Sequence, residues 1–315
     1  MGYSSRYHAA SLVAVFIALA VGILIGSEFG GEVVTSTRES LERSLAENLE
    51  DSQEEVDELA SRLERSQDFG ERAFPALAGD RLRDRRIGLV AIGSLEPAMT
   101  EWVEDALEPT GAELTAVGVV RVPPAIEELA DEMAGTRFAD IAEEPQRLEA
   151  LGERLGAELD DGGRLLERLR GDMFSRISGG FRDIDGLIVV RAEPEDLEPE
   201  QTRMTDRLRE GLLSGMAGSD ATVVGAEGTD AEPSSIALFE SHNIASVDNV
   251  DEIAGRLSLV LALVGAQGNF GAKSTADSFL PDLIPAPGTG SGSGASAGSG
   301  AGARSGAGGG DPAGR

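Results

Sequence analysis

The side chains of this chain that could do acid–base chemistry are two histidines and many carboxylates. Ser241, His242 and Asp248 have the residue types of a catalytic triad. They lie on one short turn-and-strand stretch, where neighbouring side chains do not normally converge on a substrate. We therefore predict that His242 is an ordinary surface or turn histidine. The sequence predicts no catalytic residues and favours a protein that is not an enzyme.

Acidic pairs flank a short apolar run near the middle of the chain. They are Asp183 and Asp185 on one side and Glu193, Glu195 and Asp196 on the other. Such carboxylates could hold a loosely bound divalent cation. With a formal net charge of −29, however, the chain is expected to contain acidic pairs that have no function. We predict no metal site here.

Two glycine-bearing turns could bring the backbone close to a ligand. Gly93–Pro97 follows the first predicted strand, but it lacks the further glycines that let a backbone approach a pyrophosphate, so we predict no nucleotide cofactor. Asn269–Lys273 follows the last predicted helix, and its glycine is interpreted as a helix-ending cap. The alternative is that Lys273 contacts a ligand or the carboxyl edge of a sheet.

The elements that would position these residues begin near residue 80, where short β-rich runs alternate with helical patterns. The predicted strands are Ile87–Ile92, Leu114–Val120, Leu187–Val190, Thr222–Val224 and, more weakly, Ile244–Val247. The predicted helices are Pro97–Leu107, capped by Ser94, then Gln146–Leu159, Arg164–Met173, Thr202–Met216 and Val250–Val264. Residues 123–181 form a long insert that could make a lid or protrusion.

Nearly continuous apolar strands separated by helices indicate a parallel sheet covered on both faces. The predicted fold class is α/β, a doubly wound layer sandwich of the Rossmann or flavodoxin kind. If this domain were an enzyme, its site would lie at the carboxyl edge of the sheet, above Gly93, Arg191 and Gly225.

A membrane anchor is predicted at the N-terminus. Tyr7–Ser27 holds 21 residues without a charged side chain, which as a helix span about 31 Å, close to the thickness of a bilayer core. Arg6 precedes the helix, and Glu28 and Glu32 follow it, so we predict a single-pass protein of the cell membrane with a cytoplasmic N-terminus and an extracytoplasmic globular domain. A signal peptide cleaved after Ala18-x-Ala20 is the alternative.

Small residues recur along one face of this predicted helix. They are Ala10, Ala14, Ala18, Gly22 and Gly26. Ala14, Ala18, Gly22 and Gly26 are candidate helix–helix contacts, because small side chains let two backbones approach closely in lipid. Their frequency in membrane helices in general is the other explanation.

A coiled-coil stalk is predicted to follow the anchor. Its heptad seam consists of Leu45, Leu49, Val56, Leu59 and Leu63, with Ser52 as a polar interruption. A parallel dimer or higher oligomer is favoured over a single amphipathic helix that packs on the globular domain. Because small-residue spacing and heptad spacing favour opposite crossing hands, we expect a break between the two segments, near Gly30–Gly31.

The whole chain then divides into an anchor (residues 1–30), a stalk (31–70), an α/β domain (80–281) and a disordered Gly/Ser/Ala tail (288–315). Fifty-six acidic residues against 27 basic ones disfavour binding to nucleic acid. The absence of cysteine excludes disulfides, thiol catalysis and thiolate metal sites.

The N-terminal pattern carries a family resemblance. It reads Arg6-x-His8-x-x-Ser11-Leu12, then Val15-Phe16-x-Ala18-Leu19-Ala20-x-Gly22, then Gly26-Ser27. Together with the predicted stalk and the ending at Asn269–Lys273, it resembles the actinobacterial MctB family of copper transport proteins of the outer membrane. The resemblance implies a membrane protein of copper homeostasis, in a family proposed to form channels that limit intracellular copper.

The residues argue against a dedicated copper cage. Copper(I) prefers thiolate or thioether ligands and copper(II) prefers imidazole. The chain has no Cys, two His that are far apart in sequence and six Met without a close cluster. We therefore expect a role in copper homeostasis or transport without direct coordination of copper. The alternative is an envelope scaffold that presents a Rossmann-like domain outside the membrane to bind a protein or polymer.

Overall fold

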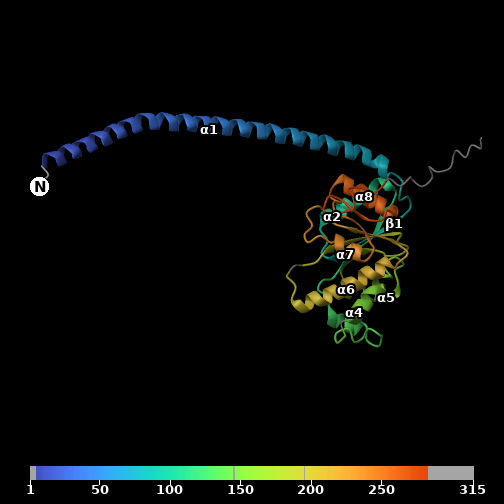
Figure 1. The fold of residues 1–315 in the computed structure, drawn as a ribbon. Coiled ribbons are helices and arrows are strands. Elements are labelled where there is room, and N and C mark those ends of the chain that lie inside the picture. Colours follow the sequence, from blue (N-terminus) through green and yellow to red (C-terminus); the bar gives the residue numbers. More distant parts are fainter. Residues whose placement is uncertain (1–4, 145, 195, 283–315) are drawn as a thin grey trace, which may run out of the picture. The chain divides into compact units, whose positions relative to one another are not determined.

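The computed structural model describes residues 5–144, 146–194 and 196–282 (Figure 1). The predicted tail at 288–315 lies outside the described residues. The chain forms two compact units, Met1–Arg72 and Ala73–Arg315. The first unit is one helix, and the second contains the sheet and its covering helices.

A single helix, α1 (Ser5–Ala78), accounts for the first unit. Its segment His8–Gly26, with a mean hydropathy of 2.7, is long and apolar enough to cross a membrane. The break expected at Gly30–Gly31 is wrong, because α1 continues through it. Two glycines cost a helix only about 1 kcal/mol each, and no proline interrupts the backbone ladder there.

The second unit is built on a seven-stranded sheet in the order β3-β2-β1-β4-β5-β6-β7. Its strands are β1 (Arg86–Gly93), β2 (Glu113–Val120), β3 (Phe174–Gly179), β4 (Gly186–Ala192), β5 (Thr222–Ala226), β6 (Ala245–Val247) and β7 (Asn269–Phe270). All pairs are parallel except the antiparallel pair of β2 and β3. The five predicted strands are confirmed.

The remaining helices are α2 (Pro97–Leu107), the 3-10 turn η1 (Glu108–Thr110), α3 (Ile126–Glu132), α4 (Gln146–Gly156), α5 (Arg164–Met173), α6 (Pro199–Ala217), α7 (Ile236–Ser241) and α8 (Ile253–Val264). The five helices predicted in this unit are present as α2, α4, α5, α6 and α8, whereas η1, α3 and α7 were not predicted. The predicted cap is wrong: Glu96 is the residue before α2, and Ser94 lies two residues earlier. The hydroxyl of Ser94 instead donates to the carbonyl of Ala192, at 3.3 Å.

Both faces of the sheet are buried, as the apolar strands require. In β1, Val90 and Ile92 belong to one core cluster, whereas Leu89 and Ala91 belong to the other. The first cluster lies under α3, α4, α5, α6 and α7. The second lies under α2, α8 and the last turns of α1, where Phe74 and Ala78 are buried.

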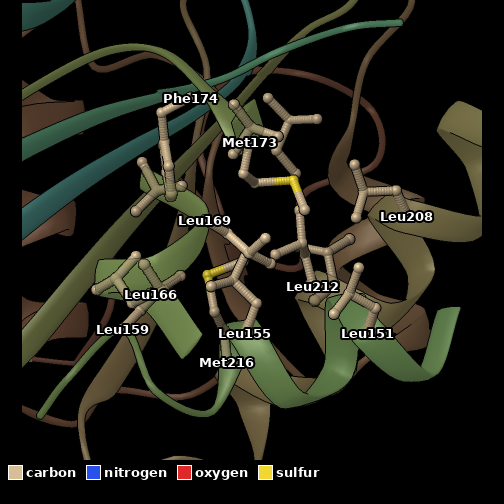
Figure 2. Close-up of a cluster of buried hydrophobic side chains, with 14 of the residues drawn as sticks. Leu151, Leu155, Leu159, Leu166, Leu169, Met173, Phe174, Leu208, Leu212 and Met216 are labelled. Carbon is tan, nitrogen blue, oxygen red and sulfur yellow. The ribbon is translucent and has the colours of Figure 1, made fainter. Parts of the chain in front are cut away.

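The insert between β2 and β4 is part of the first core and not a lid. Leucines of α4, α5 and α6 converge with Met173 and Met216 in one apolar cluster (Figure 2). Helices α4 and α6 pack backbone to backbone through Gly152, Gly156, Gly211 and Gly215. A methyl group on Gly211 would lie 2.0 Å from the carbonyl oxygen of Glu149, so only glycine permits this approach.

Candidate functional site

One cavity of the α/β unit opens at the carboxyl edge of the sheet, beside the neighbouring strands β1 and β4. It has a volume of about 390 Å³. The chain winds from β1 outward to β2 on one side and later returns to β4 on the other, so the strand order reverses at this point. Such a reversal leaves a crevice beyond the strand ends, which is where open α/β sheets bind ligands. We call this cavity the edge pocket.

Four segments at strand ends and one helix line the edge pocket, and Asp251 is the residue supplied by the segment after β6. The loop after β1 supplies Ser94 and Glu96, the end of β4 supplies Arg191 and Glu193, and the loop after β5 supplies Glu227 through Pro233. Helix α2 contributes Met99 and Trp102, the only tryptophan of the chain.

A buried ion pair lies beside the pocket, and its carboxylate, Glu227, belongs to the pocket lining. Glu227 is 3% exposed and lies 2.7 Å from the ammonium of Lys273, the only lysine in the sequence. The carboxylate also accepts hydrogen bonds from the hydroxyl of Ser234 and the backbone N–H of Ser235, both at 2.6 Å. The ammonium donates further to the carbonyl of Ala231, at 2.8 Å. Its compact charge is therefore held between two oxygens.

The turn that carries Lys273 is fixed by Asp248, at the end of β6. Asp248 is fully buried and accepts the backbone N–H groups of Ala272 at 2.7 Å and of Lys273 at 3.0 Å. Gly271 has a φ of +145°, and a methyl group there would lie 1.9 Å from the Asp248 carboxylate. The predicted helix cap is thus wrong: α8 ends at Val264 with Gly265 as its C-cap, and Gly271 instead lets the turn reach the carboxyl edge.

A second ion-pair network backs the pocket at the end of β4. Glu193 accepts from Arg191 at 2.9 Å and from Arg209 of α6 at 2.8 and 2.9 Å. Burial lowers the pKa of Arg209, but hydrogen bonding and charge attraction from Glu193 and Asp206 outweigh burial and raise its pKa above the ordinary value. The acidic residue Glu193 is therefore neutralised by two guanidinium groups.

The carboxylates at the mouth of the pocket are not neutralised in this way. Glu96, Asp230 and Glu232 are exposed lining residues without an ion pair among the described residues. The carboxylate of Asp251 accepts the backbone N–H and the hydroxyl of Thr229, at 2.7 and 3.0 Å, and the guanidinium of Arg256 donates to the backbone carbonyl of Asp251 at 3.3 Å. The mouth therefore carries an excess of negative charge.

Of the three triad residue types, Ser241 and His242 are in contact, but Asp248 is engaged elsewhere. His242 follows α7, and its ring contacts the hydroxyl of Ser241 at 3.1 Å and the carboxylate of Glu210 at 3.2 Å. Its side chain is only 9% exposed, so it lies under the surface of its turn. Asp248 is engaged with the Gly271 turn instead.

The acidic pairs around β4 also have separate partners. Asp185 accepts the backbone N–H of Arg86 at 2.9 Å and lies 3.5 Å from Arg85. Glu193 accepts hydrogen bonds from Arg191 and Arg209. Glu195 lies outside the described residues. No group of three or more His, Cys, Asp or Glu in the described parts of the chain could hold a metal ion.

The predicted contact residues of the first unit all lie on α1 and are exposed. A methyl group added at Gly22 or Gly26 would meet nothing within 4 Å. Ala14 and Ala18 are exposed on the same helix. The seam residues Leu45, Leu49, Val56, Leu59 and Leu63 are 55–65% exposed. These faces are available for contacts that a single chain does not make.

Comparison with known proteins gives one family. A family model described as "Copper transport outer membrane protein, MctB" matches residues 3–281. No curated protein matches the chain.

Proposed function

Because the chain belongs to the family of MctB copper transport outer membrane proteins, we propose that it is a membrane-anchored protein of copper homeostasis that does not itself coordinate copper. The family match over residues 3–281 carries the role in copper transport or homeostasis. The apolar segment His8–Gly26 supports the anchor by its length and composition.

The donor atoms of the chain support an indirect role. Copper sites are built from thiolates, thioethers and imidazoles. Cysteine is absent, and His242 is engaged with Ser241 and Glu210. Met173 and Met216 are buried in the apolar core, where a thioether serves packing.

We further propose that the protein self-associates through α1. The small-residue face supports close packing in lipid, and the exposed heptad seam supports a parallel coiled coil beyond it. Three heptads are marginal in water, but tethering to a membrane raises the effective concentration. The N-terminus would be cytoplasmic and the α/β unit extracytoplasmic, following the flanking charges.

We propose a doubly wound, Rossmann-like classification for the α/β unit and a binding role without catalysis. The strand order, with its reversal between β1 and β4, supports the classification. For the binding role, the two buried carboxylates of the edge pocket, Glu193 and Glu227, are both engaged by cations. A carboxylate bound in this way is not free to accept a proton, so neither of these two residues acts as a general base.

Copper content tests the main proposal. Cells that lack the protein should accumulate a different amount of copper from cells that carry it, and re-expression should restore the original value. An unchanged copper content would contradict the role in copper homeostasis. The purified full-length protein in detergent should bind copper no more tightly than about 1 mM. Micromolar binding would contradict the indirect role.

Crosslinking in membranes tests the assembly. Gly22→Leu/Gly26→Leu should lower the dimer yield, whereas Ala20→Leu, on the opposite side of the helix, is the matched control and should leave it unchanged. Leu49→Lys/Leu59→Lys should lower the yield through the seam, because charges in a coiled-coil core disrupt it. If all variants crosslink as the unmodified chain does, α1 is not the assembly element.

The alternative is an envelope scaffold that presents the α/β unit outside the membrane. The edge pocket and the exposed seam are the observations that favour it, because both are surfaces for binding other molecules. This function would leave cellular copper unchanged and would make the protein co-purify with a partner through the α/β unit.

A further inference from the structure

We propose that the edge pocket is a binding site for a small organic cation, a ligand that carries an alkylammonium group. The proposal rests on three features that coincide: the place of the pocket in the sheet, the charge of its mouth and the aromatic ring in its wall. It is independent of the copper role.

The edge pocket lies where α/β sheets usually bind ligands. The pocket opens beyond the ends of β1 and β4, where the strand order reverses, and its volume of about 390 Å³ lies in the range of small-molecule sites. The two strand ends approach closely here, since a methyl group on Gly93 would lie 2.1 Å from the carbonyl oxygen of Ala192. The two strands are therefore paired up to the edge at which the pocket opens.

The charged residues that line the pocket indicate the charge of its ligand. Arg191 is the one basic residue that lines the described pocket, and its guanidinium is already bound to Glu193 at 2.9 Å. Lys273, at the side of the pocket, is likewise held by Glu227. The free charges are carboxylates: Glu96, Asp230 and Glu232 line the pocket without a cationic partner among the described residues. The carboxylate of Asp251 also lines the pocket and accepts from Thr229, while the guanidinium of Arg256 donates to the backbone carbonyl of Asp251 at 3.3 Å. An anionic ligand would be repelled, and a cation would be attracted.

The wall of the pocket favours an organic cation over a metal ion. Trp102 and Met99 are lining residues of α2, and Trp102 lies against the loop at Gly228, with its ring 3.4 Å from the position of an added methyl group. Indole is the aromatic ring that binds ammonium groups best. An inorganic cation instead needs several oxygen ligands around one point, and the described residues offer no such cluster.

Trp102 makes the proposal testable, because the only tryptophan of the chain reports on this pocket. The full-length protein in detergent is titrated with tetramethylammonium chloride and with 1,5-diaminopentane, and tryptophan fluorescence and calorimetry are recorded. We expect a saturable change below about 10 mM that sodium chloride at equal ionic strength does not produce. Calcium chloride and inorganic phosphate are titrated in parallel.

Variants link the signal to the pocket. Asp230→Asn/Glu232→Gln should weaken binding about tenfold, whereas Glu240→Gln, an exposed carboxylate on α7 outside the pocket, should not change it. Trp102→Leu, followed by calorimetry alone, should weaken binding about fivefold. Circular dichroism checks that each variant is folded, and an unfolded double variant is replaced by the two single variants.

Three results would overturn the proposal. They are the absence of saturable binding of either ammonium compound, equal or tighter binding of calcium or phosphate, and unchanged affinity in the folded Asp230→Asn/Glu232→Gln variant. None of them bears on the copper content of cells, so the proposal and the copper role can fail separately.

Discussion

The sharpest test of the architecture at the carboxyl edge is the replacement of Lys273 by methionine. The substitution keeps the apolar length of the side chain but removes the ammonium that lies 2.7 Å from Glu227 and 2.8 Å from the carbonyl of Ala231. Glu227 is 3% exposed, so its charge would remain buried with only two hydrogen-bond donors. Removing one partner of a buried pair costs about 3–5 kcal/mol.

Because the side chain of Lys273 is 18% exposed, water can partly reach the site, and we expect the lower end of that range, about 3 kcal/mol. For a domain of this size, that loss lowers the melting temperature by about 6–12 °C. The assay is urea unfolding of the full-length protein in detergent, followed by fluorescence of Trp102, which lies in the second unit.

Glu227→Gln/Lys273→Met is the matched control, because it removes both charges together. It should recover most of the lost stability, since no unpaired charge stays buried. If Lys273→Met alone lowered the free energy of unfolding by less than about 0.5 kcal/mol, the ion pair would contribute no more than an exposed one, and the reasoning would be refuted.

Two further predictions concern glycines. Gly271→Ala should lower the free energy of unfolding by about 3 kcal/mol, because a methyl group there would overlap the Asp248 carboxylate, whereas Gly265→Ala, which meets nothing within 4 Å, should cost only its backbone strain, about 1–2 kcal/mol. Gly211→Ala should cost about 2–4 kcal/mol by forcing α4 and α6 apart, whereas Gly171→Ala, in open space on α5, should stabilise the protein by about 0.5–1 kcal/mol. Urea unfolding measures all four variants, and equal effects within either pair would contradict the packing described for it.

The elements predicted correctly are those whose pattern of apolar residues matches their burial in the fold. β1 and β4 are continuous apolar runs because helices cover both of their faces. β3 was not predicted. It is an antiparallel edge strand whose residues Ser175 and Arg176 are exposed, so it lacks the continuous apolar run of the other strands. β7 contains two residues, too few for any periodicity to be visible.

The close packing of α4 on α6 was not predicted from the sequence. Four-residue glycine spacing was interpreted as a contact only in the anchor, at Gly22 and Gly26. The same spacing occurs at Gly152 and Gly156 of α4, and again in α6, and there the structure uses it in a soluble core. The signal was present in both helices, but glycine spacing alone does not identify the partner helix.

The edge pocket could be located only in part from sequence. Gly93, Arg191 and Gly225 marked the correct edge, because strand ends follow from the strand prediction. Glu227 and Lys273 are 46 residues apart, and no local pattern connects them. Their contact depends on the adjacent order of β5, β6 and β7, which brings the turn after β7 beside the loop after β5.

The geometry around Glu227 explains why residue 273 is a lysine and not an arginine. Every other basic side chain of the protein is an arginine, so the composition alone favours arginine at any exposed ion pair. At Glu227 the cation must fit between a buried carboxylate oxygen and the carbonyl of Ala231, and its backbone is fixed by Asp248. A compact ammonium can serve both oxygens, whereas a planar guanidinium needs a wider, forked arrangement of acceptors. We therefore expect that Lys273→Arg would displace the Gly271 turn from the sheet.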